Sequence, residues 1–369
     1  MWILIRVILF SFVITTTVSS TPSEERTVLE GLLRSYDGSV RPFQQDLVYR
    51  TSNLSTIISV NMYVRSISSI DDVKMVYEAQ LTYRMQWLDE RLKFSRDKAN
   101  YLTLPGTLSQ KVWKPDLFFS NEMEYRLHDG LSKNEYYRVY PNGEVLFSAR
   151  ITLKLLCPMA LQKYPFDTQV CPIRMASYGY TTDDIIFAWK RDDPVQVNSN
   201  LSLPEYKLTT IGTERCDSTT TTGRYSCLRV DFHFQRNTFP WLRDVYLPMA
   251  ISILIVWLSS WMDVEQMGRV WVLGSAIFYC KWIAFNHTAT TLRLISYSTS
   301  FHWWSWGCDV LIGWAILEFV VVQRLSSVER GKCRSCQNFM EIVMRIGFLV
   351  GFAMVISCCY VKYLDQNVE

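Results

Sequence analysis

Apolar residues are concentrated in the last third of this chain, and their spacing limits its possible folds more than any other feature. After about residue 238, four apolar runs occupy residues 242–261, 270–285, 303–322 and 346–361. A helix needs roughly 17–25 apolar residues to cross a bilayer, so the second and fourth runs are short. We expect a four-helix transmembrane bundle in residues 239–369.

The connection between the third and fourth runs, about residues 324–340, is very short and basic. Its charged residues are Arg324, Arg330, Lys332 and Arg334, against Glu329. Short loops rich in Lys and Arg stay on the cytoplasmic side of a membrane. An even number of spans then places both termini of the chain outside the cell.

Residues 1–20 have the pattern of a secretory signal peptide. Arg6 precedes a mostly apolar run from Val7 to Ile14, and small residues follow it. The run is shorter than a membrane span, which favours a signal peptide over a short membrane anchor. We expect cleavage near Ser20 and an extracellular location for residues 21–238.

This outer region has the pattern of a β domain that begins with a helix. Residues 24–36 have the apolar spacing of an amphipathic helix. Short segments of alternating polarity follow, and residues 141–143, Pro-Asn-Gly, separate two of them as in a hairpin. Many short strands with turns between them favour a β-sandwich.

Four cysteines lie in the outer region and can form two disulfides in an oxidising compartment, with three possible pairings. The simplest pairing is short-range and joins Cys157 to Cys171 and Cys216 to Cys227. A closed loop of this size restricts the unfolded chain by roughly 3 kcal/mol.

Glycosylation sequons begin at Asn53 and Asn200, in agreement with an extracellular location. A third sequon, at Asn286, lies next to an apolar run, so we expect it to stay unmodified.

Several classes of function are disfavoured. The chain has 38 Lys and Arg against 35 Asp and Glu, so no basic excess points to a nucleic acid partner. The four histidines are scattered without metal spacing, and no Gly-rich phosphate loop is present. Cys333 and Cys336 have zinc-like spacing but no second pair. We therefore expect no enzyme activity, no metal and no cofactor.

Four segments resemble those of the Cys-loop receptor superfamily. The segment from Cys157 to Cys171 is similar to the signature loop, including its core Pro-Phe-Asp at residues 165–167. Residues 113–122, 175–184 and 222–231 are similar to three ligand-site loops. The second cysteine pair is characteristic of the glycine and invertebrate glutamate-gated chloride branches, and the chain resembles the glutamate-gated branch most.

The resemblance implies five subunits around a pore, with the ligand bound between neighbours. One face of a subunit would bind a carboxylate through Arg84, with Ser148 as a hydroxyl donor beside it. The opposite face would offer an aromatic cage for an ammonium group, formed by Phe119, Tyr178 and Tyr225. Hydrogen bonds would come from Ser177 and Thr222.

One segment departs from the glutamate-gated pattern. Those channels use a second basic residue after the segment equivalent to residues 91–94. Here the equivalent stretch, residues 95–100, is two residues shorter than in those channels. Arg96 or Lys98 could take the place of the second basic residue. Arg224 also adds positive charge near the site. Glycine, GABA or another small ligand therefore remains open.

The second apolar run is expected to line the pore. Gly268 and Arg269 stand where anion-selective members have Pro-Ala-Arg, and no acid is adjacent, which favours anion selectivity. Two registers are possible for the lining. One presents Trp271, Ser275, Phe278 and Trp282, and the other presents Val272, Ala276, Tyr279 and Ile283.

Either lining is bulky, so we expect homopentamers to conduct poorly. Lys281 would form a ring of positive charge or turn toward Asp309 or Glu318 in the third run. The expected protein is a subunit of a neurotransmitter-gated chloride channel. We expect it in the lipid of the plasma membrane, in particular the postsynaptic membrane, as part of a homo-pentamer or, more in keeping with the bulky lining, a hetero-pentamer. The alternatives are a non-conducting auxiliary subunit, or a channel gated by glycine, GABA, an amine or pH.

Overall fold

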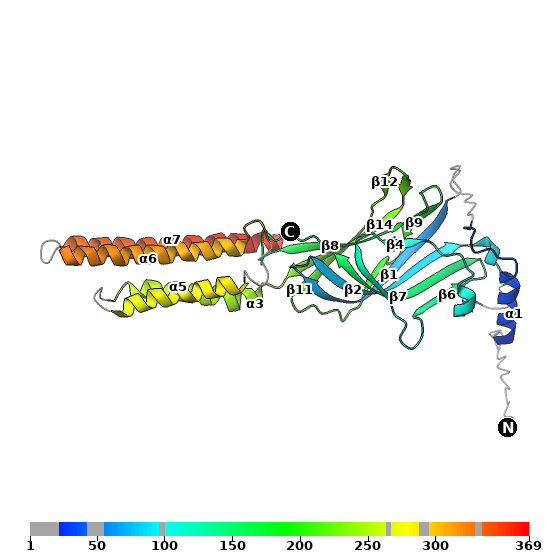
Figure 1. Ribbon diagram of the computed structural model, residues 1–369, viewed down its shortest axis with the longest axis horizontal. Helices are drawn as coiled ribbons and strands as arrows, with labels where there is room; N and C mark the ends of the chain where they lie inside the picture. Colours follow the sequence, from blue (N-terminus) through cyan, green and yellow to red (C-terminus); the bar gives the residue numbers. More distant parts are fainter. Residues whose placement is uncertain are drawn as a thin grey trace, which may run out of the picture.

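The computed structural model describes residues 22–42, 55–95, 100–262, 267–287, 295–328 and 334–368. The expected signal peptide, Asn53, Arg96 and Lys98 lie outside these residues. Figure 1 shows a β domain at one end of the long axis and a set of long helices at the other. Helix α1 (Pro22–Leu33) lies at the far end of the β domain.

Two sheets form the β domain, as the sequence predicted. One has eight strands in the order β10-β1-β2-β7-β6-β3, with β5 paired to β7 and β9 paired to β1. The other has four strands in the order β11-β14-β8-β4, and β12 pairs with β13 in a separate hairpin. The strands are β1 (Thr56–Asp71), β2 (Val76–Leu88), β3 (Leu102–Leu104), β4 (Leu117–Phe119), β5 (Glu122–Leu127), β6 (Glu135–Val139), β7 (Glu144–Leu156), β8 (Thr168–Ser177), β9 (Ile185–Trp189), β10 (Val195–Val197), β11 (Tyr206–Arg215), β12 (Ser218–Thr220), β13 (Gly223–Tyr225) and β14 (Cys227–Arg236).

Alternation of side chains along the strands separates the core from the outer faces. In β2, Tyr83, Met85 and Trp87 are buried, whereas Arg84 and Gln86 lie on the outer face. Successive residues of a strand point to opposite faces, so one set packs between the sheets and the other is available for binding. Two short helical turns, η1 (Glu90–Leu92) and α2 (Gly106–Ser109), complete the domain.

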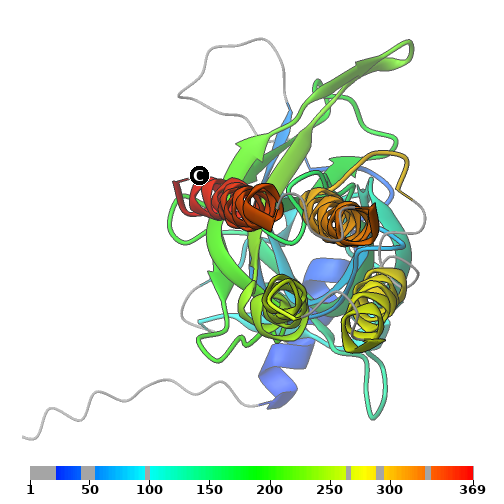
Figure 2. The ribbon, with the colours of Figure 1, turned by 90° about the vertical axis from the view of Figure 1, so that its left-hand side faces the viewer.

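The helical part begins directly after β14. Its elements are α3 (Phe239–Trp241), the π-helical turn η2 (Leu242–Tyr246), α4 (Leu247–Ser259), α5 (Met267–His287), α6 (Ser300–Val328) and α7 (Arg334–Val368). Figure 2 shows α4 to α7 end-on, clustered in front of the β domain. Contacts join α4 with α5 and α6, α5 with α6, and α6 with α7.

Three segments of the described residues are long and apolar enough to cross a membrane: Phe239–Ser259, Ser300–Arg324 and Phe339–Val361. The fourth predicted span therefore begins earlier than expected. Helix α5 has 21 residues but is less apolar, because Arg269, Lys281 and Asn286 interrupt it.

The predicted connection at residues 324–340 is shorter than expected. Helix α6 continues to Val328 and α7 already begins at Arg334, so both helices extend into the predicted connection, and residues 329–333 lie outside the described residues. Helical hydrogen bonding thus extends past the apolar runs from which the boundaries were predicted.

Candidate ligand site and pore

A cavity of about 700 Å³ lies on the outer face of the four-stranded sheet, beneath the β12–β13 hairpin. We call it the aromatic pocket, because Phe118, Tyr178 and Tyr225 contribute to its lining. The other lining residues are Ser120, Arg174, Ala176, Ser177, Cys216, Ser218, Thr220, Thr222, Cys227 and Arg229. Three of the predicted ligand-site loops therefore meet in one cavity.

The hairpin above this pocket is fixed at its base and stiffened near its tip. Cys216 and Cys227 form a disulfide there, which confirms one predicted pair. Nearer the tip, the hydroxyls of Thr222 and Tyr225 are hydrogen-bonded at 2.9 Å. Gly223 has a φ of 147°, and a Cβ at this position would approach Thr181 within 3.0 Å. The turn therefore favours glycine.

Asp116, a residue that the sequence did not single out as functional, holds the loop that presents Tyr178. Its carboxylate accepts hydrogen bonds from the Ser177 hydroxyl at 2.8 Å and from the backbone N–H groups of Tyr178 and Gly179 at 3.1 and 2.6 Å. The Ser177 hydroxyl also accepts the N–H of Tyr180 at 3.0 Å. Ser177 is buried and its hydroxyl donates to Asp116, so this side chain builds the loop, and its predicted hydrogen bond to a ligand stays a prediction.

The aromatic pocket is lined by Phe118, whereas the sequence suggested Phe119. Phe119 is 4% exposed and packs edge-on against Tyr83 in the core, with ring centroids 5.7 Å apart. Phe118 lines the pocket and packs edge-on against Tyr178, also at 5.7 Å. The two phenylalanines are consecutive in β4, so they point to opposite faces, and sequence alone gave no register.

Arg84 and Ser148 lie on the outer face of the other sheet. They are directly opposite each other on β2 and β7, in a row that continues to Asn61 on β1 and Tyr136 on β6. Arg84 is half-buried and makes no side-chain hydrogen bond or ion pair with any residue that the structure describes. A half-buried guanidinium without a partner is a candidate anion site.

A second arginine of this face, Arg65 on β1, was missed by the sequence reading. Its Nε donates to the Thr82 hydroxyl at 2.7 Å. Thr82 lies two residues before Arg84 in β2, so both side chains are on the same face of the sheet. The pKa of nearby His128 is lowered, first by desolvation and then by the charges of Arg150, Arg126 and Arg65. We call Arg65, Arg84 and Ser148 the arginine face.

The aromatic pocket and the arginine face belong to different sheets, with the core between them. One chain therefore cannot bring both sets of residues to the same ligand. They can meet only if the pocket of one subunit faces the arginine face of its neighbour.

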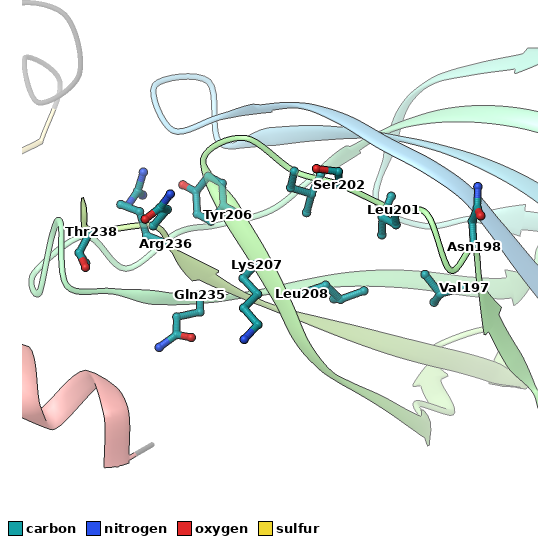
Figure 3. Close-up of a pocket in the computed structure, with 12 residues that line it drawn as sticks. Val197, Asn198, Leu201, Ser202, Tyr206, Lys207, Leu208, Gln235, Arg236 and Thr238 are labelled. Carbon is teal, nitrogen blue, oxygen red and sulfur yellow. The ribbon is translucent and has the colours of Figure 1, made fainter. Parts of the chain in front are cut away.

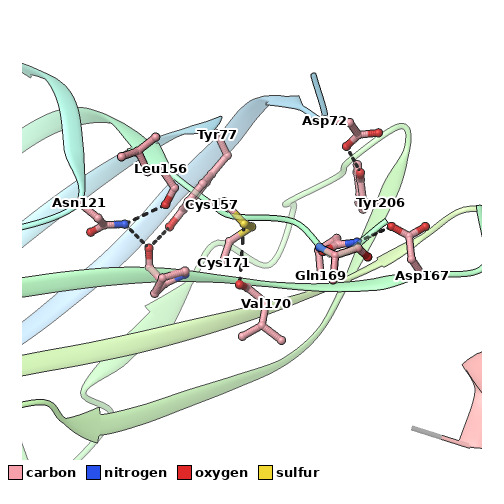
Figure 4. Close-up of a disulfide and its surroundings, with 12 residues drawn as sticks. Asp72, Tyr77, Asn121, Leu156, Cys157, Asp167, Gln169, Val170, Cys171 and Tyr206 are labelled. Carbon is pink, nitrogen blue, oxygen red and sulfur yellow. Dashed lines mark hydrogen bonds between the residues drawn. A yellow bond between two sulfur atoms is a disulfide. The ribbon is translucent and has the colours of Figure 1, made fainter. Parts of the chain in front are cut away.

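The second predicted disulfide, Cys157–Cys171, is also present and closes the loop at the base of the domain (Figure 4). Within this loop, Asp167 forms an ion pair with Arg236 at the end of β14, at 2.7 Å. Asp72, which follows β1, forms a second ion pair with Arg236, also at 2.7 Å. The Tyr206 hydroxyl donates to Asp72, as Figure 4 shows. The end of the last strand is thereby tied to the loop.

The same loop contacts the helices. The Tyr297 hydroxyl, just before α6, accepts the N–H of Leu161 at 2.9 Å. The N–H groups of Ser300 and Phe301 donate to the carbonyls of Gln162 and Tyr164 at 3.0 and 3.2 Å. Any displacement of the loop therefore acts on the start of α6.

Another cavity, of about 680 Å³, lies beside this junction (Figure 3). It is lined by residues of the segment before β11, including Tyr206, and by the end of β14, including Arg236. Asp167 and Asp72 already engage Arg236. That charge is compensated, so this cavity offers no uncompensated cation at Arg236.

On α5 the two predicted registers differ in exposure. Trp271, Ser275, Phe278 and Trp282 of one register are all exposed, whereas the other is mixed, with Ala276 and Ile283 buried, Val272 half-buried and Tyr279 exposed. Gly268 precedes them near the start of the helix. If this face lined the pore, each subunit would present the large aromatic side chains of Trp271, Phe278 and Trp282 to it.

Arg269 does not lie on this exposed face. It is 2% exposed and forms an ion pair with Glu318 of α6 at 3.3 Å, while Arg345 of α7 lies 4.0 Å from the same carboxylate. Burying a charge requires such compensation, so Arg269 turns toward the other helices and away from the expected pore axis. Lys281 is paired with Asp309 at 2.5 Å, one of the two partners predicted.

These features define a subunit of a ligand-gated ion channel. The family model of the neurotransmitter-gated ion-channel ligand binding domain matches residues 25–238, and the chain belongs to this family. The match ends where α3 begins. Over 322 residues the chain is 41% identical to a Drosophila melanogaster protein named glutamate-gated chloride channel, an alignment that covers 86% of this chain and 69% of that protein.

Proposed function

We propose that this chain is a subunit of an anion channel opened by a small amino acid ligand, similar to glutamate, that binds between neighbouring subunits. The observation that carries the proposal is Arg84, a half-buried guanidinium beside Ser148 without a partner among the described residues. A carboxylate there would form charge-assisted bonds to Arg84 and accept the Ser148 hydroxyl.

The ligand amine would occupy the aromatic pocket of the adjacent subunit. Tyr178 is 79% exposed and Phe118 supports it from below. Ring faces of this kind bind ammonium groups, and closure of the β12–β13 hairpin would bring Tyr225 onto the ligand. Closure then pulls on β14, which ends at Arg236 and its contacts with the loop above α6.

Chloride is the ion we propose. Helix α5 carries the exposed Lys281 and has no acidic residue from Met267 to His287, whereas the charge of Arg269 is compensated by Glu318. Lys281 is 59% exposed, so its charge is only partly screened by Asp309. The relative named as a chloride channel supports the same choice.

A second candidate function is that of a partner subunit that does not conduct alone. Trp271, Phe278 and Trp282 are 73%, 69% and 57% exposed on the face expected to line the pore. Five such faces around one axis leave little room for water, and apolar constrictions exclude ions by dewetting. We propose a hetero-pentamer in the plasma membrane, with residues 21–238 outside the cell, both termini extracellular and a synaptic role.

The test is expression alone and with a related chloride-conducting subunit, with currents recorded under glutamate, glycine, GABA, amines and acid. We expect glutamate to evoke chloride current in the mixed channel and Arg84→Ala to reduce its potency. The control is Arg126→Ala, an exposed arginine paired with Glu124. A reversal potential that follows sodium, or an unaltered dose response in Arg84→Ala, would contradict the proposal.

A further inference from the structure

Lys281 of α5 and Asp309 of α6 form an ion pair that stays accessible from outside the chain. The two charged groups are 2.5 Å apart, and their side chains are 59% and 31% exposed. Neither side chain makes a hydrogen bond or ion pair with any other residue that the structure describes. An ammonium has three donors and a carboxylate has several acceptor positions, so both groups keep hydrogen-bonding capacity for a further partner.

Asp309 lies well inside its helix. It is nine residues after Ser300, the first residue of α6, which is about 14 Å along the helix axis. Its short side chain cannot reach the membrane surface from that depth, and a charge that faces lipid inside a span is costly. The exposed side of this carboxylate therefore faces protein or water in the assembled protein.

The flank of α5 opposite Lys281 presents Tyr279. Successive residues of a helix are about 100° apart, so these two side chains point about 200° away from each other. Helix α6 lies on the Lys281 flank, and α4 lies on the Tyr279 flank, where it shares a cavity of about 610 Å³ with α5. Figure 2 shows α4 and α6 on different sides of α5. The exposed rings of Trp271 and Phe278 lie between the two flanks.

The cavity on the Tyr279 flank is a groove between α4 and α5, and its lining is apolar apart from two serines and Tyr279. Both serine hydroxyls are occupied within their own helices. Ser252 donates to the Met249 carbonyl at 2.7 Å, and Ser275 donates to the Val272 carbonyl at 3.0 Å. Tyr279 is 42% exposed, and its hydroxyl makes no hydrogen bond within the described part of the chain. The groove thus offers a free tyrosine hydroxyl in an apolar wall.

The two flanks have matching depths in a ring of subunits. In the five-subunit ring of this family, equal residues of identical subunits lie at equal depth. Tyr279 of one copy is then only about 3 Å along the axis from Lys281 of the next, because each residue of a helix rises 1.5 Å. A tyrosine side chain covers that offset, so its hydroxyl can reach the carboxylate that binds Lys281.

We propose that the Lys281–Asp309 flank of one copy docks against the α4–α5 groove of a second copy, whose Tyr279 hydroxyl donates to Asp309. The apolar walls of the groove would suit lipid equally well, but the carboxylate and the free hydroxyl suit each other. Docking covers Asp309 and leaves Lys281 beside the exposed rings of α5. This inference goes beyond the proposed function, because it depends neither on the ligand nor on the conducted ion.

The first test measures proximity between two differently tagged copies of the full chain that are expressed together. One copy carries Lys281→Cys with Asp309→Asn, so that no charge is left without a partner, and the other carries Tyr279→Cys. A short bifunctional thiol reagent should link the two tags in membranes. Met354→Cys, at an exposed position of α7, replaces Tyr279→Cys as the control and should give no link. Equal linking in both combinations, or in neither, would overturn the proposal.

The second test is a double-mutant cycle on the detergent-solubilised assembly, with dissociation of the subunits measured over a range of protein concentrations. Tyr279→Phe removes only the hydroxyl and should raise the dissociation constant about tenfold, because a hydrogen bond to a charged group is lost. With Lys281→Met and Asp309→Leu in place, Tyr279→Phe should change that constant less than twofold.

Tyr360→Phe, at an exposed position of α7, is the matched control for the loss of a tyrosine hydroxyl and should leave dissociation unchanged. An equal effect of Tyr279→Phe with and without the ion pair would overturn the docking contact, and so would no effect in either background. Chains that stay monomeric at every concentration would overturn it as well.

Discussion

Arg236, at the end of β14, binds Asp167 of the disulfide-closed loop through two hydrogen bonds, of 2.7 and 3.0 Å. Both side chains are almost fully buried, with 3% and 2% exposed. Two opposing effects act on the pKa of Arg236. Burial lowers this pKa, but the interactions with Asp167, Tyr206 and Asp72 raise it by more, so the pKa lies above its ordinary value. The pair connects β14, which contributes residues to the aromatic pocket, with the disulfide-closed loop that contacts the start of α6.

Asp167→Asn should destabilise the outer domain strongly. Removing one partner of a buried ion pair leaves the other charge uncompensated, at a cost of about 3–5 kcal/mol. A thermal unfolding scan of the purified protein should show a lower midpoint. Asp192→Asn, on an exposed turn, is the control, and an unchanged midpoint in Asp167→Asn would show that Asp72 alone compensates Arg236.

Arg84→Ala should weaken activation by a carboxylate ligand about tenfold to a hundredfold, because a charge-assisted hydrogen bond is worth about 1.5–3 kcal/mol. Arg84→Lys should recover only part of the loss, since an ammonium lacks the planar fork. Dose–response curves in the mixed channel measure both. Equal potency of Arg84→Lys and the unmodified channel would argue against a two-bond contact.

Phe118→Ala and Phe119→Ala should have different effects, although the residues are adjacent. Phe119 packs in the core against Tyr83, so its removal should cost about 3–5 kcal/mol of stability. Phe118 lines the pocket, so its removal should chiefly lower ligand potency. Surface expression and dose response together check this, and loss of expression in Phe118→Ala alone would reverse the assignment.

Tyr178→Leu should reduce potency more than Tyr178→Phe, because Phe keeps the ring face that binds an ammonium. The Tyr178 hydroxyl makes no hydrogen bond with any residue that the structure describes, so little else changes in Tyr178→Phe. Tyr225 behaves differently, since Tyr225→Phe also loses the bond to Thr222. Equal losses in Tyr178→Phe and Tyr178→Leu would indicate a hydroxyl contact with the ligand.

Trp271→Ala combined with Phe278→Ala should allow current through the subunit expressed alone. Both rings lie on the exposed face of α5, and smaller side chains would widen and hydrate the lining. Leu273→Ala, on the buried face, is the control for altered helix packing. Robust ligand-evoked chloride current from the unmodified subunit alone would contradict the partner role.

Sequence patterns predicted the broad architecture, since alternation, turn residues and apolar runs are local properties of the chain. The short-range disulfides Cys157–Cys171 and Cys216–Cys227 also followed from spacing and compartment, and the structure confirms both. Helix ends were less predictable: α6 and α7 extend beyond their apolar runs because backbone hydrogen bonds do not require apolar side chains.

Tertiary structure alone decided which chemically similar residue faces a site. A shift of one position moves a strand side chain to the other face, which separates Phe118 from Phe119. Pairing between distant strands brought Arg84 beside Ser148 and set Arg174 opposite Arg229, and no local pattern encodes such registers. Packing of α5 against α6 turned Arg269 inward, because Glu318 of α6 is the charge that compensates its burial. The sequence therefore determined which chemical groups exist, and the packing of distant segments determined which of them meet.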